Sequence, residues 1–181
     1  MPFKKLHADV REKLESLEIL APTPFQSTSI PVIKSGANVY CTAPKESGKT
    51  STLVWTTLQK LKCEASGNAP RAVILVENKE RAMELYELFL AYTKYNSLRV
   101  YVGHEQLHID IQKSEIFEGT DILISTPKTM NKLFLLNGVS TAQLKIISID
   151  DAEFLSQHSS YSAIMSISQS IQKCQYVIYS E

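Results

Sequence analysis

Residues 43 to 50 read APKESGKT and come close to the phosphate-binding loop pattern Gly-x-x-x-x-Gly-Lys-Ser/Thr. In such a loop the backbone N–H groups surround the β-phosphate, the lysine reaches the β- and γ-phosphates, and the threonine hydroxyl ligates Mg²⁺. The sequence therefore predicts a nucleotide site, although Glu46 adds negative charge beside the phosphates. The expected nucleotide contacts are Ala43, Pro44, Lys45, Glu46, Ser47, Gly48, Lys49, Thr50 and Ser51.

Two aspartates follow the apolar run KIISI at 145 to 149. A strand-end aspartate can hold Mg²⁺ through water, and the acidic residue after it can orient the water that attacks the γ-phosphate. The alternative is that either aspartate caps a short helix, and for this stretch alone that interpretation is the better one. The lysine and threonine of the upstream loop reverse the preference. We predict Lys49, Asp150 and Asp151 as catalytic residues, and Thr50 and Asp150 as Mg²⁺ ligands, partly through water.

A glutamine and an aromatic residue near the amino terminus could recognise adenine. Gln26 ends the stretch APTPFQ, and Phe3 lies near the start of the chain. A glutamine amide can pair with both N6 and N7 of adenine, and an aromatic ring can stack on the base. Taken singly, Gln26 is more often a surface residue and Phe3 a core residue, so this prediction depends on the rest of the pattern.

Six short apolar runs read as buried strands, with helical patterns between them. The runs cover 38–41, 72–76, 98–102, 121–125, 145–149 and 176–180, and the helical patterns cover 49–62, 79–94 and 127–136. This alternation predicts an α/β fold with a parallel sheet flanked by helices on both faces, whose ligands bind beyond the carboxyl ends of the strands. Two earlier helices are expected at 7–17 and 24–34, the second capped by Thr23. The loop 63–71 is expected to be flexible.

The composition argues against several other classes of protein. The 181 residues suit one domain, and 19 basic against 19 acidic residues exclude a strongly basic nucleic-acid binder, so any RNA contact must be local. No apolar run could span a bilayer and no signal peptide is evident, so we expect a soluble intracellular protein, cytoplasmic rather than nuclear, without a membrane partner. The three cysteines lack metal-ligand spacing and read as reduced core thiols, and the four histidines suggest no chemistry.

The order of these motifs resembles the DEAD-box family of superfamily 2 RNA helicases over nearly the whole chain. PTPFQ is similar to the adenine-reading Q motif, APKESGKT to Ala-x-x-Gly-x-Gly-Lys-Thr, DDAE to Asp-Glu-Ala-Asp and YSE to the start of Ser-Ala-Thr. The resemblance implies a RecA-like P-loop fold, with 1–181 as a single helicase ATP-binding domain and 1–34 as its N-terminal helical region. It also implies that Gln26 reads adenine and that Phe3 stacks on the base.

The chain departs from the family pattern at several motif positions. Residues 18–19 are Glu-Ile where the family has a glycine-aromatic pair, and Glu46 stands where it has a glycine. Asp151 is one methylene shorter than the catalytic glutamate, and Glu181 does not match the Ser-Ala-Thr motif. The resemblance therefore implies weakened turnover.

The RNA-binding motifs of the family are kept less well. ENKERA at 77–82 aligns with Pro-Thr-Arg-Glu-Leu-Ala, one of the paired glycines is replaced by His104, and Lys128 and Thr129 replace Gly-Arg after STP. Thr126 at a helix start still suits a phosphate, while Lys79 and Lys128 are equally well explained as solvated surface lysines. The RNA contacts that the resemblance implies are Lys79, Gly103, Thr126, Pro127 and Lys128.

Two functions of different classes follow from the resemblance. The first is ATP-dependent RNA remodelling, with ATP and Mg²⁺ as cofactors, RNA as partner, and a second RecA-like domain that supplies the arginine finger. The second is a catalytically weakened helicase-like scaffold or RNA- or partner-binding module, comparable to the Tudor-linked helicase-like proteins of germline small-RNA pathways. A small-molecule kinase fits poorly, because the Q-like motif and STPKT would then be coincidences. Hydrolysis by this domain alone is expected to be weak.

Overall fold

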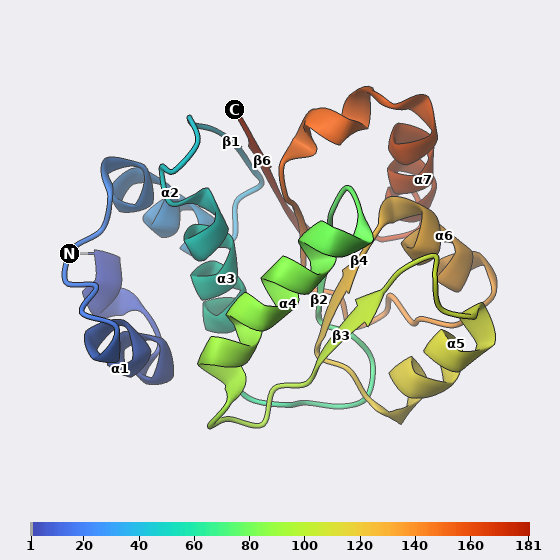
Figure 1. Ribbon diagram of the computed structural model, residues 1–181, viewed down its shortest axis with the longest axis horizontal. Coiled ribbons are helices and arrows are strands. Elements are labelled where there is room, and N and C mark those ends of the chain that lie inside the picture. Colours follow the sequence, from blue (N-terminus) through green and yellow to red (C-terminus); the bar gives the residue numbers. More distant parts are fainter. Residues whose placement is uncertain (1) are drawn as a thin grey trace.

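The computed structural model describes residues 2–181, and a six-stranded parallel sheet runs through its centre (Figure 1). The strands are β1 (Val39–Thr42), β2 (Ala72–Leu75), β3 (Val100–Gly103), β4 (Ile122–Ser125), β5 (Ile146–Ile149) and β6 (Gln175–Ser180). Their order across the sheet is β1-β6-β5-β2-β4-β3. In register, Leu75 of β2 pairs with Ile149 of β5 and with Ser125 of β4. The phosphate-loop strand β1 and the aspartate strand β5 are thus separated by β6 alone.

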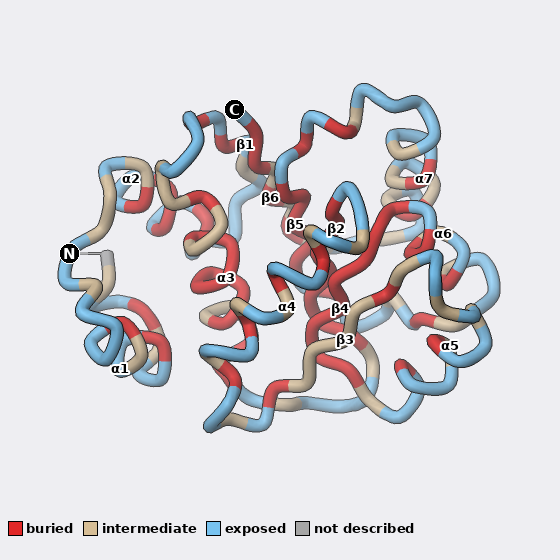
Figure 2. The backbone as a smooth tube through the Cα atoms, in the orientation of Figure 1, coloured by how far each residue is buried: buried red, intermediate tan, exposed pale blue. Residues whose placement is uncertain are grey.

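Helices cover both faces of the sheet (Figure 1). On one face lie η1 (Pro2–Lys5), α1 (Ala8–Ser16), α2 (Pro24–Lys34), α3 (Lys49–Lys60) and α4 (Lys79–Thr93). On the other lie α5 (Ile109–Glu118), α6 (Pro127–Leu135), η2 (Ala152–Ser156) and α7 (His158–Ser168). Alternate residues of β2 point to opposite sides: Ile74 packs in the first layer, and Val73 and Leu75 pack in the second. Figure 2 shows the resulting continuous buried centre.

All six predicted strands and all five predicted helices are present, with ends shifted by at most a few residues. The α/β fold with a parallel sheet and helices on both faces is confirmed. Two helices, α5 and α7, were not predicted. The sequence of α7, HSSYSAIMSIS, is rich in serine, which has only moderate helix propensity. Packing of α7 against α6 through the buried Ile167 therefore contributes more to this helix than propensity does.

The loop 63–71 differs from the flexible segment that its composition predicts. Asp121, at the start of β4, has a fully buried side chain and accepts hydrogen bonds from Ser66 N at 3.1 Å and Arg71 Nη2 at 2.9 Å. Arg99 also binds Asp121, through Nε at 3.0 Å, and donates to the carbonyl of Gly67 at 2.6 Å. The buried carboxylate thus ties the loop to the sheet, a long-range contact that composition does not reveal.

Candidate functional site

The predicted phosphate and metal residues meet at the carboxyl edge of the sheet. The loop 43–48 follows β1, Thr126 follows β4, and Asp150 follows β5. In a parallel sheet these strand ends share one edge, where the loops form the usual ligand crevice. A cavity of ≈ 870 Å³ lies instead near the segments that precede β5 and β6, and none of the predicted site residues lines it.

The phosphate loop has backbone angles that favour glycine at two positions. Gly48, the N-cap of α3, has φ 95°, and a Cβ there would lie 2.5 Å from Nε2 of Gln26, so only glycine fits. Glu46 has φ 60°, a left-handed conformation that costs a non-glycine residue about 1–2 kcal/mol. The loop therefore adopts the shape that a glycine would favour, and carries a glutamate there.

Lys49 is turned toward the loop itself. Its buried ammonium donates hydrogen bonds to the carbonyl oxygens of Ala43 and, at 3.0 Å, of Pro44. The hydroxyl of Ser47 is buried and has no hydrogen-bond partner within residues 2–181. A phosphate at the start of α3 would give the ammonium and this hydroxyl an anionic partner, in addition to the N–H groups of the first helical turn.

The glutamine of the Q-like motif forms a hydrogen bond to the phosphate loop. Thr23 and Gln26 form a reciprocal capping box at the start of α2, with Thr23 N donating to Gln26 Oε1 at 3.0 Å. The same two side chains reach the loop: Thr23 Oγ1 donates to Ser47 O at 2.7 Å, and Gln26 Nε2 donates to Gly48 O at 3.3 Å. Gln26 is buried rather than exposed, and its recognition of adenine stays a prediction.

Phe3 packs against the core. Its ring lies edge-on to Trp55 of α3, with 5.4 Å between centroids and an interplanar angle of 90°. Pairs of this geometry contribute about 0.5–1.5 kcal/mol beyond the area that they bury. The contact of Phe3 with Trp55 therefore stabilises the packing of α3, and stacking of Phe3 on adenine stays a prediction.

Arg81 of α4 connects the predicted metal ligands, and no motif pointed to it. Its Nε donates to Asp150 Oδ2 at 2.6 Å, and its Nη2 donates to Thr50 Oγ1 at 2.9 Å. Nη1 donates to Glu84 Oε2 at 3.0 Å, and Asp151 lies 3.9 Å from Nε. The available signal was a charged residue at the leucine position of the motif Pro-Thr-Arg-Glu-Leu-Ala, where ENKERA has Arg81.

The electrostatics of this pair follow from burial. Asp150 is 2% exposed at its side chain, and burial raises its pKa, while the neighbouring guanidinium opposes the rise. Burial lowers the pKa of Arg81, but the hydrogen bond and charge of Asp150 outweigh that effect and hold it above the ordinary arginine value. Because arginine stays protonated at any ordinary pH, Arg81 is the permanent counter-charge of Asp150.

The arrangement does not fit a directly bound Mg²⁺. Thr50 Oγ1 and Asp150 Oδ2 are the kind of hard oxygen ligands that Mg²⁺ prefers, at about 2.0–2.1 Å in octahedral geometry. Both oxygens instead accept hydrogen bonds from one guanidinium, which lies between them. The oxygen ligands are of the type that Mg²⁺ prefers, whereas the geometry places the guanidinium of Arg81 between them.

Glu181, the residue after β6, also reaches this edge. The backbone N of Glu181 donates to Glu153 Oε1 at 2.6 Å, and this hydrogen bond lowers the pKa of Glu153. Lys45 of the phosphate loop lies 3.9 Å from the carboxylate of Glu181, with both side chains exposed. An exposed pair of this kind contributes little energy, so it holds Lys45 only loosely.

The predicted RNA residues form a second part of the edge. Thr126 caps α6, accepting from Thr129 N at 3.3 Å, and its hydroxyl donates to Glu105 Oε1 at 2.8 Å. Lys79 donates to Gln106 Oε1 at 2.8 Å, 27 residues away in sequence. The hydroxyl that was expected to bind a phosphate thus already binds a carboxylate.

A groove of ≈ 550 Å³ adjoins this part of the edge. Lys128, at the second residue of α6, is exposed and lines it, as does His104, whose pKa is lowered by burial and by the charge of Lys79. Gly103 is buried behind it, and a Cβ there would lie 3.1 Å from Oε1 of Gln112. Pro127 begins α6 and is buried, and its contact with RNA stays a prediction.

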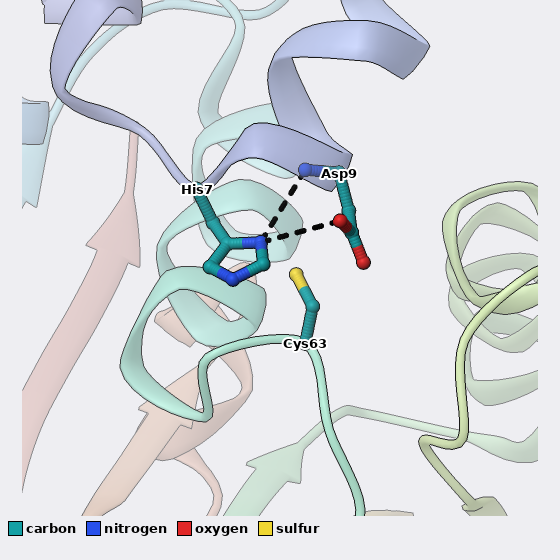
Figure 3. A group of neighbouring side chains, drawn as sticks. All are labelled: His7, Asp9 and Cys63. Atoms are coloured by element: carbon teal, nitrogen blue, oxygen red, sulfur yellow. Dashed lines mark hydrogen bonds and ion pairs between the residues drawn. The ribbon is translucent and has the colours of Figure 1, made fainter.

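One group of potential metal ligands lies elsewhere in the fold, although the spacing of the cysteines and histidines in the sequence did not indicate a metal site. Ligand atoms of His7, Asp9 and Cys63 lie within 4.8 Å of one another (Figure 3). His7 caps α1 by accepting a hydrogen bond from Asp9 N at 3.3 Å. His108 caps α5 in the same way, accepting from Asp110 N at 3.3 Å, and this second His-Asp pair belongs to no group of potential metal ligands among the described residues. Helix capping therefore accounts for the His-Asp pair.

The Cys63 thiol is buried, and burial together with the charge of Asp9 raises its pKa to about 12. This favours the protonated thiol, in agreement with the interpretation of Cys63 as a core residue. Cys41 is also buried and Cys174 is partly buried, and all three cysteines are free thiols.

None of the helices within residues 2–181 combines the length and apolar character that crossing a bilayer requires.

Solved structures share this fold. The DEAD box protein from Methanococcus jannaschii superposes with a TM-score of 0.88 at 16% identity, covering 97% of this chain and 48% of that chain. The yeast DEAD-box splicing factor Prp28 superposes with a TM-score of 0.85 at 19% identity, covering 97% of this chain and 44% of that one. At these identities the likeness establishes a RecA-like fold.

Sequence comparison places the chain in a family. It is 32% identical over 164 residues to the ATP-dependent RNA helicase DBP9 of Cryptococcus neoformans, covering 85% of this chain and 26% of the relative. It is 31% identical over 136 residues to the ATP-dependent RNA helicase ddx54 of Dictyostelium discoideum, covering 74% of this chain and 12% of the relative. The chain thus spans about a quarter or less of these relatives. Residues 23–180 match the DEAD/DEAH box helicase family, and the chain belongs to that family.

Proposed function

We propose that this chain is the nucleotide-binding RecA-like domain of an ATP-dependent RNA helicase and binds ATP at the carboxyl edge of its sheet. The observation that carries the proposal is the meeting of Lys49 and Thr50, after β1, with Asp150, after β5. The N-terminus of α3 adds unpaired N–H groups and a favourable dipole for phosphate. The family supports ATP as the nucleotide.

RNA is the proposed second ligand. The matched relatives carry the name RNA helicase, and the groove beside Lys128 lies on the same edge as the phosphate loop. Contacts there would go to the backbone of a single strand, through the first turn of α6 and the lysine side chains. Lys79 and Thr126 would first have to leave Gln106 and Glu105.

Remodelling of RNA by this proposal requires a second RecA-like domain to close over both ligands and supply an arginine finger. The two solved structures are about twice as long as this chain, which supports a partner domain of similar size. The scaffold function is not favoured by the relatives, whose names describe ATP-dependent helicases. A cytoplasmic location stays a prediction.

Calorimetric titration with ADP and GDP tests the nucleotide. We expect ADP to bind more tightly than GDP, and Gln26→Ala to remove the preference. Because Gln26 also supports the phosphate loop, the variant will weaken both nucleotides, so the ratio of the two affinities is the informative quantity. Gln143→Ala, which removes an exposed glutamine before β5, is the matched control and should keep the ratio. Equal affinities in the wild type would refute adenine recognition.

Lys49→Ala tests the phosphate loop. Removing the ammonium should weaken ADP strongly, because the buried lysine is the principal positive charge next to the expected phosphates. An ADP affinity that is unchanged in Lys49→Ala would place the nucleotide elsewhere.

Fluorescence anisotropy of a labelled single-stranded RNA, with and without a non-hydrolysable ATP analogue, tests RNA as the second ligand.

A further inference from the structure

Arg81 presents a fixed positive charge between the two oxygens that were expected to hold Mg²⁺. Its Nε and Nη2 bind Asp150 Oδ2 at 2.6 Å and Thr50 Oγ1 at 2.9 Å. We propose that Arg81 takes the place of the divalent cation in this site, so that the domain binds nucleotide phosphates without requiring Mg²⁺. The proposal rests on the proposed nucleotide site and specifies the form of its ligand.

The guanidinium is held on three sides. Besides Asp150 and Thr50, Nη1 donates to Glu84 at 3.0 Å, one turn further along α4, and the side chain is 25% exposed. A planar, permanently charged fork with this many partners loses little further freedom when it binds an anion. Arg81 is therefore positioned before any ligand arrives.

Simultaneous occupation by Arg81 and Mg²⁺ is unfavourable. Whether these two oxygens hold the ion directly or, for Asp150, through a water, the ion would lie beside a guanidinium that bears a like charge and already binds both oxygens. Asp151, 3.9 Å from Arg81 Nε, is the only further carboxylate within ion-pair distance of that nitrogen among the described residues. To bind Thr50 and Asp150, Mg²⁺ must displace Arg81.

The same guanidinium can serve a phosphate directly. Glu84 is 67% exposed, so exchanging it for an anionic oxygen at Nη1 removes only a solvated contact. Arginine binds phosphate through charge-assisted, often bidentate, hydrogen bonds. Arg81 of α4 and Lys49 of α3 would then both contact the phosphates, next to Thr50.

The first test compares ADP affinity in excess Mg²⁺ with that in EDTA, by calorimetry. In the wild type we expect the two affinities to agree within about twofold, below the usual range of 5- to 150-fold for coupled ligands. In Arg81→Met, which keeps the apolar stem and removes the charge, Mg²⁺ should tighten ADP by about tenfold or more. Lys94→Met, at the other end of α4, is the charge-matched control and should behave as the wild type.

The second test needs no nucleotide. Mg²⁺ alone should leave the melting temperature of the wild type unchanged and raise that of Arg81→Met, because only the variant exposes the oxygen pair to the ion. Failure of all proteins to bind ADP would contradict the proposed function, while the melting series would still decide on Arg81. A melting temperature that rises equally in wild type and variant would overturn the proposal.

If Arg81→Met fails to fold, the wild type alone still tests the proposal. An ADP affinity that Mg²⁺ improves by more than about fivefold in the wild type would overturn the proposal, whatever the variants show. Arg81→Lys provides a folded intermediate case, since a lysine keeps the charge but lacks the fork. The change in ADP affinity that Mg²⁺ causes in Arg81→Lys should lie between the changes in the wild type and in Arg81→Met. A change equal to that of the wild type would assign the effect to the charge alone and overturn the role of the contact through both Nε and Nη2.

Discussion

Two glutamates lie where the domain is expected to receive anionic ligands. Glu46 is exposed in the phosphate loop at φ 60°, and Glu105 accepts a hydrogen bond from Thr126 at the predicted RNA contact. Each adds a negative charge next to a phosphate position, and Glu46 also adds backbone strain. At the scale of single residues, the site therefore opposes its own ligands, and simple substitutions should relieve this.

Glu46→Gly should bind ATP with Mg²⁺ most tightly, Glu46→Gln less tightly and the wild type least. A carboxylate near a phosphate costs about 1–3 kcal/mol at effective dielectrics between water and ~20, and only glycine also removes the left-handed strain. Calorimetry should show the Gln-to-Glu difference shrinking as salt screens the charge. Glu18→Gly is the matched control, because Glu18 has φ 58° but lies outside the loop. A wild type as tight as Glu46→Gly at low salt would show that the carboxylate points away from the phosphates.

Glu105→Gln should increase affinity for single-stranded RNA. The substitution keeps an acceptor for Thr126 and removes one negative charge beside the predicted backbone contact. Anisotropy titrations at several salt concentrations should show a gain of about threefold to tenfold at low salt that narrows at high salt. Glu118→Gln, at the far end of α5, removes the same charge and should have little effect. An unchanged affinity in Glu105→Gln would place the RNA elsewhere.

Among the elements, the connection between α3 and β2 depends on one buried carboxylate. Asp121 binds Arg71, which is 8% exposed at its side chain, and reaches the loop at Ser66 and the strand β3 region at Arg99. Burial pushes the pKa of Asp121 upward, but the hydrogen bonds from Arg99, Arg71 and Ser66 together outweigh burial and hold it below its ordinary value. The ionised form is therefore part of the fold.

Asp121→Asn should lower the free energy of unfolding by about 3–5 kcal/mol, because it leaves the buried Arg71 without its counter-charge. Urea unfolding followed by circular dichroism measures this. Asp110→Asn, at a side chain that is 74% exposed, should change stability by less than about 0.5 kcal/mol. A loss of similar size in both variants would mean that the buried network contributes no more than a surface charge.

Acid should weaken the wild type through the same carboxylate. Since the pKa of Asp121 is lower in the folded than in the unfolded chain, its contribution is present above the unfolded value of about 3.9 and is lost as pH falls through the folded value. Unfolding free energies between pH 6 and 2 should therefore fall more steeply in the wild type than in Asp121→Asn. Parallel curves for the two proteins would contradict this linkage.

At the scale of the whole molecule, residues 2–181 form a RecA-like fold whose candidate site lies along an open edge of the sheet. Lys49, Arg81 and Asp150 come from different elements but from the same domain, and the proposed arginine finger would come from another. Catalysis of phosphoryl transfer depends on positioning charges around the γ-phosphate, which one half of the proposed two-domain site would do incompletely.

This domain alone should hydrolyse ATP negligibly. A phosphate-release assay on the isolated chain, compared with a longer chain that carries a second RecA-like domain, measures the difference. If the proposed second domain supplies an arginine finger, the isolated chain should be slower by about 10³-fold or more. Turnover by the isolated chain that matches an intact helicase and disappears in Lys49→Ala would show that the domain is self-sufficient.

Local patterns predicted most of the fold and the candidate residues that come together at the carboxyl edge, while the roles of those residues stay predictions. The runs at 72–76, 121–125 and 145–149 are mostly apolar because the strands that they form are covered on both faces of the sheet. The helix α7 was missed because its serines give little local signal. Arg81 was missed because its partners lie 31 and 69 residues away in sequence.

The amino-acid sequence by itself determined the alternation of strands and helices and the loop around Gly48. The physical reason is that periodicity and left-handed backbone angles depend on residues only a few positions apart. Only the tertiary structure decided that Arg81 lies between Thr50 and Asp150 and that Glu105 binds Thr126. These contacts depend on the strand order β1-β6-β5-β2-β4-β3, which brings distant strand ends to one edge and selects the partner of each charged side chain there.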